Sequence, residues 1–365
     1  MENFNLAEYL TRGVDNLVKN ILRATLQDPK ESAFMMKYSL SVKEANKRRM
    51  KLKDSGEHIP PFLIASITSS CNLHCAGCYA RHNKACLDSS PVEQLSDKEW
   101  HRIFREASDL GISFVLLAGG EPMIRRDVIR VAGDVPEILF PIFTNGTMID
   151  DKYLELFDSC RNLVPVFSIE GHKDKTDSRR GEGVHTRLLE AMEKMQNKHL
   201  IFGASVTVTR ENMNEVFSDS FVDDLHLRGC KVIFYIEYVP ISSETTNLAP
   251  TDDDRAFMEK SMAELRAFRP EMIFIAFPGD EKTTGGCLAA GRGFFHINSH
   301  GGAEPCPFSP YSDISVRNAP LRKALESNLF RALQNESVLT GEHVGGCVLF
   351  EQKDKVEEIV ARSKS

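Results

Sequence analysis

Three cysteines stand in one short stretch of the sequence, Cys71, Cys75 and Cys78, directly after an apolar run. Their spacing is Cys-x3-Cys-x2-Cys. Thiolates select soft metals, and an iron–sulfur cubane offers four ligand positions. Three thiols leave one iron of a cubane open to a small molecule, so the spacing indicates a redox enzyme whose cluster binds a further ligand.

Zinc is the alternative interpretation of the same stretch. A structural zinc site is closed by a fourth ligand, and His74 or Cys86 would be that ligand here. The spacing favours an iron–sulfur cluster over zinc.

A second candidate site follows the next apolar run, at Gly119, Gly120 and Glu121. Two glycines let a backbone approach a ligand closely, and the Glu121 carboxylate suits a ligand's ammonium group. Gly-Gly-Glu alone is compatible with a plain turn. Its expected position, one strand along from the cysteines and at the same strand end, makes it informative.

The elements that position these residues alternate between strand and helix. Six units imply a parallel sheet with right-handed crossovers, and they fall short of a closed eight-fold barrel. We therefore expect an α/β fold built on a partial (β/α)6 barrel, with function at the carboxyl ends of the strands. The predicted strands are 62–68, 114–118, 138–144, 163–169, 202–209 and 232–238.

Changes in composition and hydrophobic periodicity divide the chain into four segments. Residues 1–58 show helical periodicity and end at a Pro-Pro pair, residues 59–278 hold the strand–helix alternation, residues 279–350 are rich in glycine, and residues 351–365 form a charged tail. We expect an N-terminal helical segment, the barrel, a small C-terminal domain and the tail.

Composition narrows the class of protein. The chain has 365 residues, 42% hydrophobic and 27% charged, as in an ordinary globular protein. A net charge of −7 and a pI of about 5.9 argue against nucleic-acid binding. No apolar run spans a bilayer and no signal peptide is apparent, so we expect a cytoplasmic protein. In that reducing compartment, nine cysteines indicate metal ligands or catalytic thiols before disulfides.

These motifs together resemble the radical S-adenosylmethionine (SAM) enzymes over about residues 60–270. The matching residues are the three cysteines, the Gly-Gly-Glu turn and Ser168-Ile169-Glu170-Gly171 at the end of the fourth predicted strand. The resemblance implies a 4Fe–4S cluster whose open iron binds SAM. It also implies reductive cleavage of SAM to a 5′-deoxyadenosyl radical that takes a hydrogen atom from a substrate. The electron would come from a reductase, a flavodoxin or a ferredoxin.

The resemblance assigns roles to individual residues. The Gly-Gly-Glu turn would hold the methionyl ammonium, and Ser168 and Glu170 would contact the ribose and methionyl parts of SAM. Arg180 would pair with the SAM carboxylate, with Arg187 as its competitor; a plain surface position is the alternative for both.

One position departs from the family pattern. Members often carry an aromatic residue just before the third cysteine, and this chain has Gly77 there. Tyr79, which follows the third cysteine, would substitute.

A further resemblance, to the auxiliary-cluster domains called SPASM or Twitch, lies in residues 279–350. Cys287, Cys306 and Cys347 would hold a second iron–sulfur cluster, with a lone zinc site as the alternative. The fourth position would be open to substrate or filled by Asp280, His296 or Cys230. An open iron would anchor substrate, and a closed cluster would relay an electron.

Each of the other polar residues near strand ends has two alternative roles. Asn145 lines the site or serves a turn, Glu237 binds substrate or forms a salt bridge, and His296 is more often packed than a ligand. Cys160 and Cys230 are expected in the core, and Cys86 in a loop without a role.

The predicted function is therefore a radical SAM enzyme with an unidentified substrate. Peptide or protein modification, a cofactor precursor and a lipid are all compatible. The alternative from another class is a non-catalytic iron–sulfur electron-transfer or zinc-binding protein, which would not explain the Gly-Gly-Glu and Ser-x-Glu motifs.

Overall fold

A single nine-stranded sheet forms the centre of the molecule, in the order β7-β6-β5-β4-β3-β2-β1-β8-β9. The computed structural model describes residues 5–24, 28–88, 93–278, 285–340 and 346–363. Neighbouring strands run parallel except for the β8–β9 pair. The strands are β1 (Phe62–Thr68), β2 (Phe114–Gly119), β3 (Phe140–Thr144), β4 (Leu163–Ser168), β5 (Gly203–Val208), β6 (Val232–Glu237), β7 (Ile273–Phe277), β8 (His296–Ile297) and β9 (Ala303–Glu304).

The predicted partial barrel is confirmed, and all six predicted strands are present within a few residues of their expected bounds. The sheet also has a seventh parallel strand, β7, which pairs with β6 and which the sequence analysis did not identify. Its five residues, Ile-Phe-Ile-Ala-Phe, are apolar but form only a short run, and over the described residues 285–295 no crossover helix leads on to the next strand.

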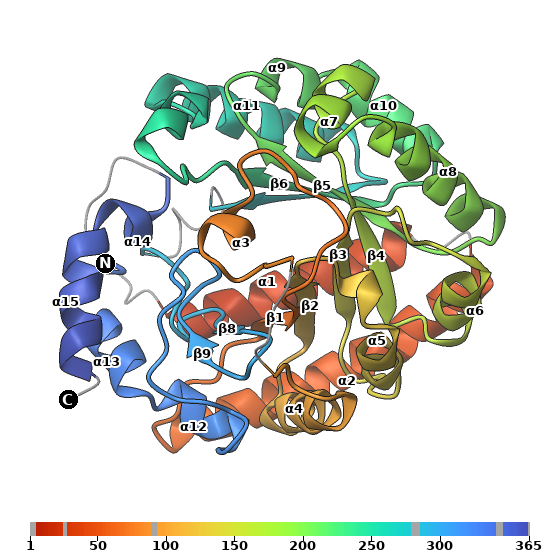
Figure 1. Ribbon diagram of the computed structural model, residues 1–365. Helices are drawn as coiled ribbons and strands as arrows, with labels where there is room; N and C mark the ends of the chain where they lie inside the picture. Colours follow the sequence, from red (N-terminus) through yellow and green to blue (C-terminus); the bar gives the residue numbers. More distant parts are fainter. Residues whose placement is uncertain (1–4, 25–27, 89–92, 279–284, 341–345, 364–365) are drawn as a thin grey trace.

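Helices cover the outside of the curved sheet, and the side-chain core lies between them and the strands (Figure 1). Local signals set their ends. For example, Ser96 and Glu99 form a capping box at the start of α4, and Gly111 ends that helix in the left-handed conformation. These helices are α4 (Asp97–Leu110), α5 (Arg126–Gly133), α6 (Asp151–Ser159), α7 (Lys173–Arg180), α8 (Val184–Asn197), α9 (Met213–Val216), α10 (Asp219–Leu227) and α11 (Asp252–Phe268).

Two long helices, α1 (Leu6–Ala24) and α2 (Pro29–Asp54), close the amino end of the barrel (Figure 1). Val14 and Val18 of α1 share a buried cluster with Phe114 and Val164, which lie at the starts of their strands. The buried Tyr38 of α2 donates a hydrogen bond of 2.6 Å to the Ser113 carbonyl. The N-terminal helices therefore form the floor beneath the barrel.

The C-terminal segment continues the barrel's own sheet. β8 pairs in parallel with β1, so that Ile64 faces His296, and β9 then turns back beside β8. Helices α12 (Leu321–Leu325), α13 (Asn328–Asn335), α14 (Val348–Glu351) and α15 (Lys353–Ser363) gather on the same side of the molecule (Figure 1). In the described ranges, no helix combines the length and apolar character needed to cross a bilayer.

We predict that Glu31→Ala destabilises the protein by loosening this floor. The Glu31 carboxylate lies 2.5 Å from the Arg161 guanidinium, and both side chains are almost fully buried. Without Glu31, the buried Arg161 guanidinium keeps its ion pair with the half-exposed Asp158, which compensates the charge only in part, so we expect a loss of about 2–4 kcal/mol in the free energy of unfolding.

The matched control is Lys30→Ala. Lys30 precedes Glu31 on α2, and its ion pair with Asp158 of α6 is exposed to solvent. Exposed pairs contribute less than about 1 kcal/mol. Urea unfolding measures both variants, and equal losses would contradict the role of the buried pair.

Candidate active site

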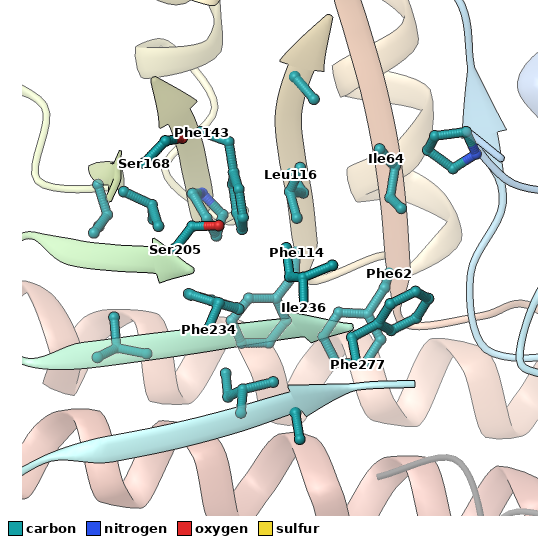
Figure 2. A pocket seen from close by; sticks show the side chains of 18 of the residues that line it. Phe62, Ile64, Phe114, Leu116, Phe143, Ser168, Ser205, Phe234, Ile236 and Phe277 are labelled. Atoms are coloured by element: carbon teal, nitrogen blue, oxygen red, sulfur yellow. The ribbon is translucent and has the colours of Figure 1, made fainter. Parts of the chain in front are cut away.

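A cavity of about 1010 Å³ opens beside the cysteine loop and continues through the inside of the barrel. Its upper wall comes from the carboxyl ends of the strands, and its lower wall includes residues of α1. Figure 2 shows side chains that line the inner part. Those labelled there are Phe62, Ile64, Phe114, Leu116, Phe143, Ser168, Ser205, Phe234, Ile236 and Phe277.

The three cysteines lie on the loop between β1 and the short helix α3 (Tyr79–His82), and all of them line the cavity. Their side chains are half-buried. The loop is fastened to the end of α7, because the Ala76 N–H donates to the Arg179 carbonyl at 2.8 Å and the Arg179 Nε donates to the Ala76 carbonyl at 3.1 Å.

Gly119 and Gly120 bring the end of β2 into close contact with the start of the cysteine loop. A Cβ atom at Gly119 would lie 2.3 Å from the Thr68 carbonyl oxygen, and one at Gly120 would lie 2.0 Å from the Ser70 carbonyl oxygen. Gly119 also has a φ of +132°, which favours glycine. The glycines therefore serve a backbone-to-backbone approach, in addition to any approach to a ligand.

Glu121 is a buried residue that lines the cavity, at the start of the short 3-10 helix η1 (Pro122–Ile124). Its Oε1 accepts from Thr144 Oγ1 at 2.6 Å and from the Met123 N–H at 3.0 Å, and its Oε2 accepts from the Asn145 N–H at 2.8 Å. Burial raises the pKa of this carboxyl, and these hydrogen bonds oppose the rise. Glu121 thus ties the ends of β2 and β3 together beside the cavity.

Glu170 and Arg180 meet at the opposite wall. Glu170 is buried just after β4, and its Oε1 accepts from the guanidinium groups of both Arg179 and Arg180. Arg180 Nη1 also lies 4.0 Å from the Cys75 sulfur. Burial lowers the pKa of Arg180, but Glu170 and Cys75 outweigh it and the pKa is raised. A fixed positive charge therefore stands next to the thiol.

Of the remaining residues predicted from the SAM resemblance, some line the cavity and others do not. Ser168 lines the cavity at the end of β4, whereas Arg187 is exposed on α8 and is not among the lining residues. Asn145 fits both interpretations, since it lines the cavity and its Oδ1 accepts from the Thr147 N–H at 3.0 Å, a local turn contact. The sequence analysis did not single out Arg179, which lines the cavity beside Arg180.

The arrangement of the three thiols is compatible with a cubane. Over the described residues, no three His, Cys, Asp or Glu side chains converge on a point that one metal ion would occupy. A cubane presents three different irons to three thiols, so the thiols need not converge. The His74 side chain is 66% exposed and pairs with Asp88, so its imidazole is engaged elsewhere than as a fourth metal ligand.

Cys86 is buried and its thiol is hydrogen-bonded to that of Cys71, which raises the pKa of Cys71 and lowers the pKa of Cys86. Cys86 thus contacts a predicted cluster ligand, and the expectation that it has no role stays a prediction. Of the two cysteines expected in the core, Cys230 is buried there, whereas Cys160 is half-buried and packs against the edge of the core. Cys230 is buried with its thiol 3.3 Å from the Val232 carbonyl, and Cys160 lies close to Gly133.

The three C-terminal cysteines lie in different parts of their segment. Cys306 lines the cavity, Cys287 is buried with its N–H bonded to the Leu339 carbonyl, and Cys347 immediately precedes α14. Their joint binding of a second cluster stays a prediction.

The candidates for the fourth ligand of that cluster differ in what the structure says of them. Asp280 lies outside the described residues. Cys230 precedes β6 and so lies at the amino end of the barrel. His296 is buried, with Nδ1 2.7 Å from Glu304 and Nε2 2.7 Å from Ser66 Oγ.

Glu237 lines the cavity and is paired with Arg255 at 2.7 Å, as its salt-bridge interpretation predicted.

We predict that Gly120→Ala displaces the cysteine loop. The added methyl group would overlap the backbone at Ser70, which cannot move without moving Cys71, so we expect a loss of at least about 2 kcal/mol of stability and less iron bound after reconstitution. Iron counting and urea unfolding measure the two effects.

The control for this variant is Gly13→Ala, where an added Cβ meets no atom within 4 Å. Wild-type iron content in Gly120→Ala would contradict the close-approach argument.

Comparison with known proteins agrees with this geometry. A profile of the radical SAM superfamily matches residues 65–218. The chain is 28% identical over 310 residues to the AdoMet-dependent heme synthase of Methanosarcina barkeri, which covers 77% of this chain and 87% of that protein. The PqqA peptide cyclase of Rhizobium meliloti is 24% identical over 296 residues, or 76% of this chain and 77% of that protein.

Among solved structures, Streptococcus suis SuiB shares the fold, with a TM-score of 0.64 at 17% identity over 80% of this chain and 72% of SuiB. The superfamily match itself includes the cysteine loop, the Gly-Gly-Glu turn and the Glu170–Arg180 pair. Residues 65–218 of this chain therefore form a radical SAM domain.

Proposed function

We propose that this enzyme takes a hydrogen atom from an apolar, ring-containing cofactor precursor of the tetrapyrrole class, bound inside the barrel beneath SAM. The observation that carries the proposal is the apolar cavity that continues from the cysteine loop into the barrel. The heme synthase relative, matched over 87% of its own length, supports the same substrate class.

The upper end of the cavity would hold SAM. Cys71, Cys75 and Cys78 would hold the cluster, which when bound supplies the electron that cleaves SAM to methionine and the 5′-deoxyadenosyl radical. Arg180 offers its charge to the SAM carboxylate and stays oriented by Glu170. The Gly-Gly-Glu turn would face the methionyl ammonium, and Ser168 would contact the ribose.

The inner cavity selects for an apolar substrate because of what lines it. Phe143 and Phe234 pack edge to face against each other in its lining, with ring centroids 5.2 Å apart, and Ile64, Leu116 and Ile236 add aliphatic surface (Figure 2). Several charged lining residues are already paired: Arg161 with Glu31, and Glu237 with Arg255. Such a wall stabilises a hydrophobic ring system and disfavours buried polar groups.

Peptide modification is the second candidate, supported by the match to a peptide cyclase over 77% of that relative. An extended peptide carries a backbone donor and acceptor at each residue, and the apolar inner wall leaves these groups without partners. A peptide would therefore place only a side chain in the barrel. A lipid chain fits the apolar wall but not the aromatic character of its lining.

We also propose that Cys287, Cys306 and Cys347 bind a second iron–sulfur cluster. Cys306 supports this role, because it lines the same cavity as the three N-terminal cysteines. A cluster there lies within reach of the substrate space, where it would accept an electron from a substrate radical or anchor a substrate atom. A flavodoxin, a ferredoxin or a reductase would supply electrons to the first cluster.

The first test separates an enzyme from a non-catalytic iron–sulfur or zinc protein. We expect the anaerobically reconstituted and reduced protein to form 5′-deoxyadenosine from SAM, and Cys75→Ala to form none above background. The control is Cys160→Ala, whose thiol is half-buried near Gly133 and is not among the residues that line the cavity. An intact cluster in the wild type without any 5′-deoxyadenosine would reject the proposed chemistry.

The second test identifies the substrate class. A deuterated porphyrin with propionate side chains, a deuterated apolar peptide and a deuterated isoprenoid lipid are each incubated with enzyme, SAM and reductant. We expect deuterium in 5′-deoxyadenosine from the porphyrin alone, since the hydrogen atom moves directly to the 5′ carbon. Deuterium from the peptide alone would replace the tetrapyrrole proposal with peptide modification, and deuterium from the lipid alone would replace it with lipid modification.

A further inference from the structure

Tyr238 follows the end of β6 and places its side chain against the cysteine loop. The residue is only 4% exposed, and its N–H donates to the Val208 carbonyl at 2.9 Å, which fixes its backbone beside β5. A Cβ atom at Gly77 would lie 3.0 Å from the Tyr238 hydroxyl oxygen and 3.2 Å from its Cε2. The phenol therefore covers Gly77, between the second and third cysteines.

The hydroxyl of Tyr238 is buried and has no hydrogen-bond partner among the residues that the structure describes. Leaving a buried hydroxyl unsatisfied costs about 1–3 kcal/mol. Tyr238 lines the cavity together with Cys75, Gly77 and Cys78. The missing partner is thus expected from whatever fills the cavity next to the loop.

Tyr79 is less suited to this role, although it is the nearest aromatic residue in the sequence. Its ring packs against Phe308 with centroids 4.8 Å apart, and burial raises its pKa. Tyr79 is thus engaged with the C-terminal segment, whereas Tyr238 occupies the space that a side chain at position 77 would fill.

We propose that the Tyr238 hydroxyl hydrogen-bonds to the nucleoside part of SAM, and that glycine at position 77 makes room for this tyrosine. The inference rests on the proposed SAM site. Adenine nitrogens and ribose hydroxyls can hydrogen-bond to a phenol, whereas the sulfonium cannot, and the carboxylate and ammonium groups of SAM are assigned to Arg180 and to the Gly-Gly-Glu turn. Tyr238 is therefore a cofactor-binding residue contributed by the segment that follows β6.

The test compares SAM binding by Tyr238→Phe and wild type, each reconstituted anaerobically and matched in iron content. Equilibrium dialysis with SAM and the change in the EPR spectrum of the reduced cluster give two independent dissociation constants. We expect Tyr238→Phe to bind SAM about three- to tenfold more weakly, the effect of one lost hydrogen bond.

Tyr235→Phe is the matched control on the same strand, because the Tyr235 hydroxyl already donates to the Val216 carbonyl at 2.8 Å. Its affinity for SAM is expected to equal that of the wild type. Equal affinity in Tyr238→Phe would overturn the inference and assign the hydroxyl to a water molecule. Failure of the wild type to bind SAM would instead reject the proposed function.

A double-mutant cycle with Gly77→Ala examines the link between the two residues. The methyl group would press on the Tyr238 hydroxyl, and the φ of +67° at position 77 adds strain that is the same in either background. We expect Gly77→Ala to weaken SAM binding more in the wild type than in Tyr238→Phe. Equal effects in the two backgrounds would show that strain alone acts, and would contradict the proposed exchange.

Discussion

The backbone contact between the cysteine loop and the end of β2 is the constraint on which the site depends. The Gly120 N–H donates to the Thr68 carbonyl at 2.9 Å, and the Glu121 N–H donates to the Ser70 carbonyl at 2.8 Å. Only glycine permits this approach, since any Cβ would overlap a carbonyl oxygen. The loop that carries the thiols is thereby held in register with the neighbouring strand by backbone hydrogen bonds.

Charge at the other end of the loop complements this contact. Glu170 holds two arginines, and one of them extends to the Cys75 sulfur. A buried carboxylate with two guanidinium partners keeps a net positive charge beside the cysteines. That charge suits thiolates and an anionic cofactor group equally, so the same pair serves cluster and SAM.

The barrel is closed at its amino end and extended at its edge by segments outside the repeated strand–helix units. α1 and α2 pack on the starts of the strands, and β8 extends the sheet from β1. His296 joins this extension to β1 through Ser66 and to β9 through Glu304. The C-terminal segment is thus bound to the barrel by sheet pairing and a buried polar network, which positions Cys306 at the shared cavity.

Local sequence determined the fold class and the main motifs of this protein. Apolar runs alternating with helical periodicity specify parallel strands and crossover helices, and the spacing of Cys71, Cys75 and Cys78 specifies the loop. These signals are local because each one depends on neighbours within a few residues. Neither β7 nor the pairing of β8 with β1 was predicted from the sequence, because short strands are defined by their partner strands, which are distant in the sequence.

Tertiary structure decided which side chains meet. Arg180 turns inward toward Glu170 while Arg187 stays exposed, and Tyr238 covers Gly77 from a strand about 160 positions along the chain. Cys86 likewise reaches Cys71 only through the folding of its loop. No spacing rule contains these contacts, because they arise from the curvature of the sheet and the packing of loops at its carboxyl end.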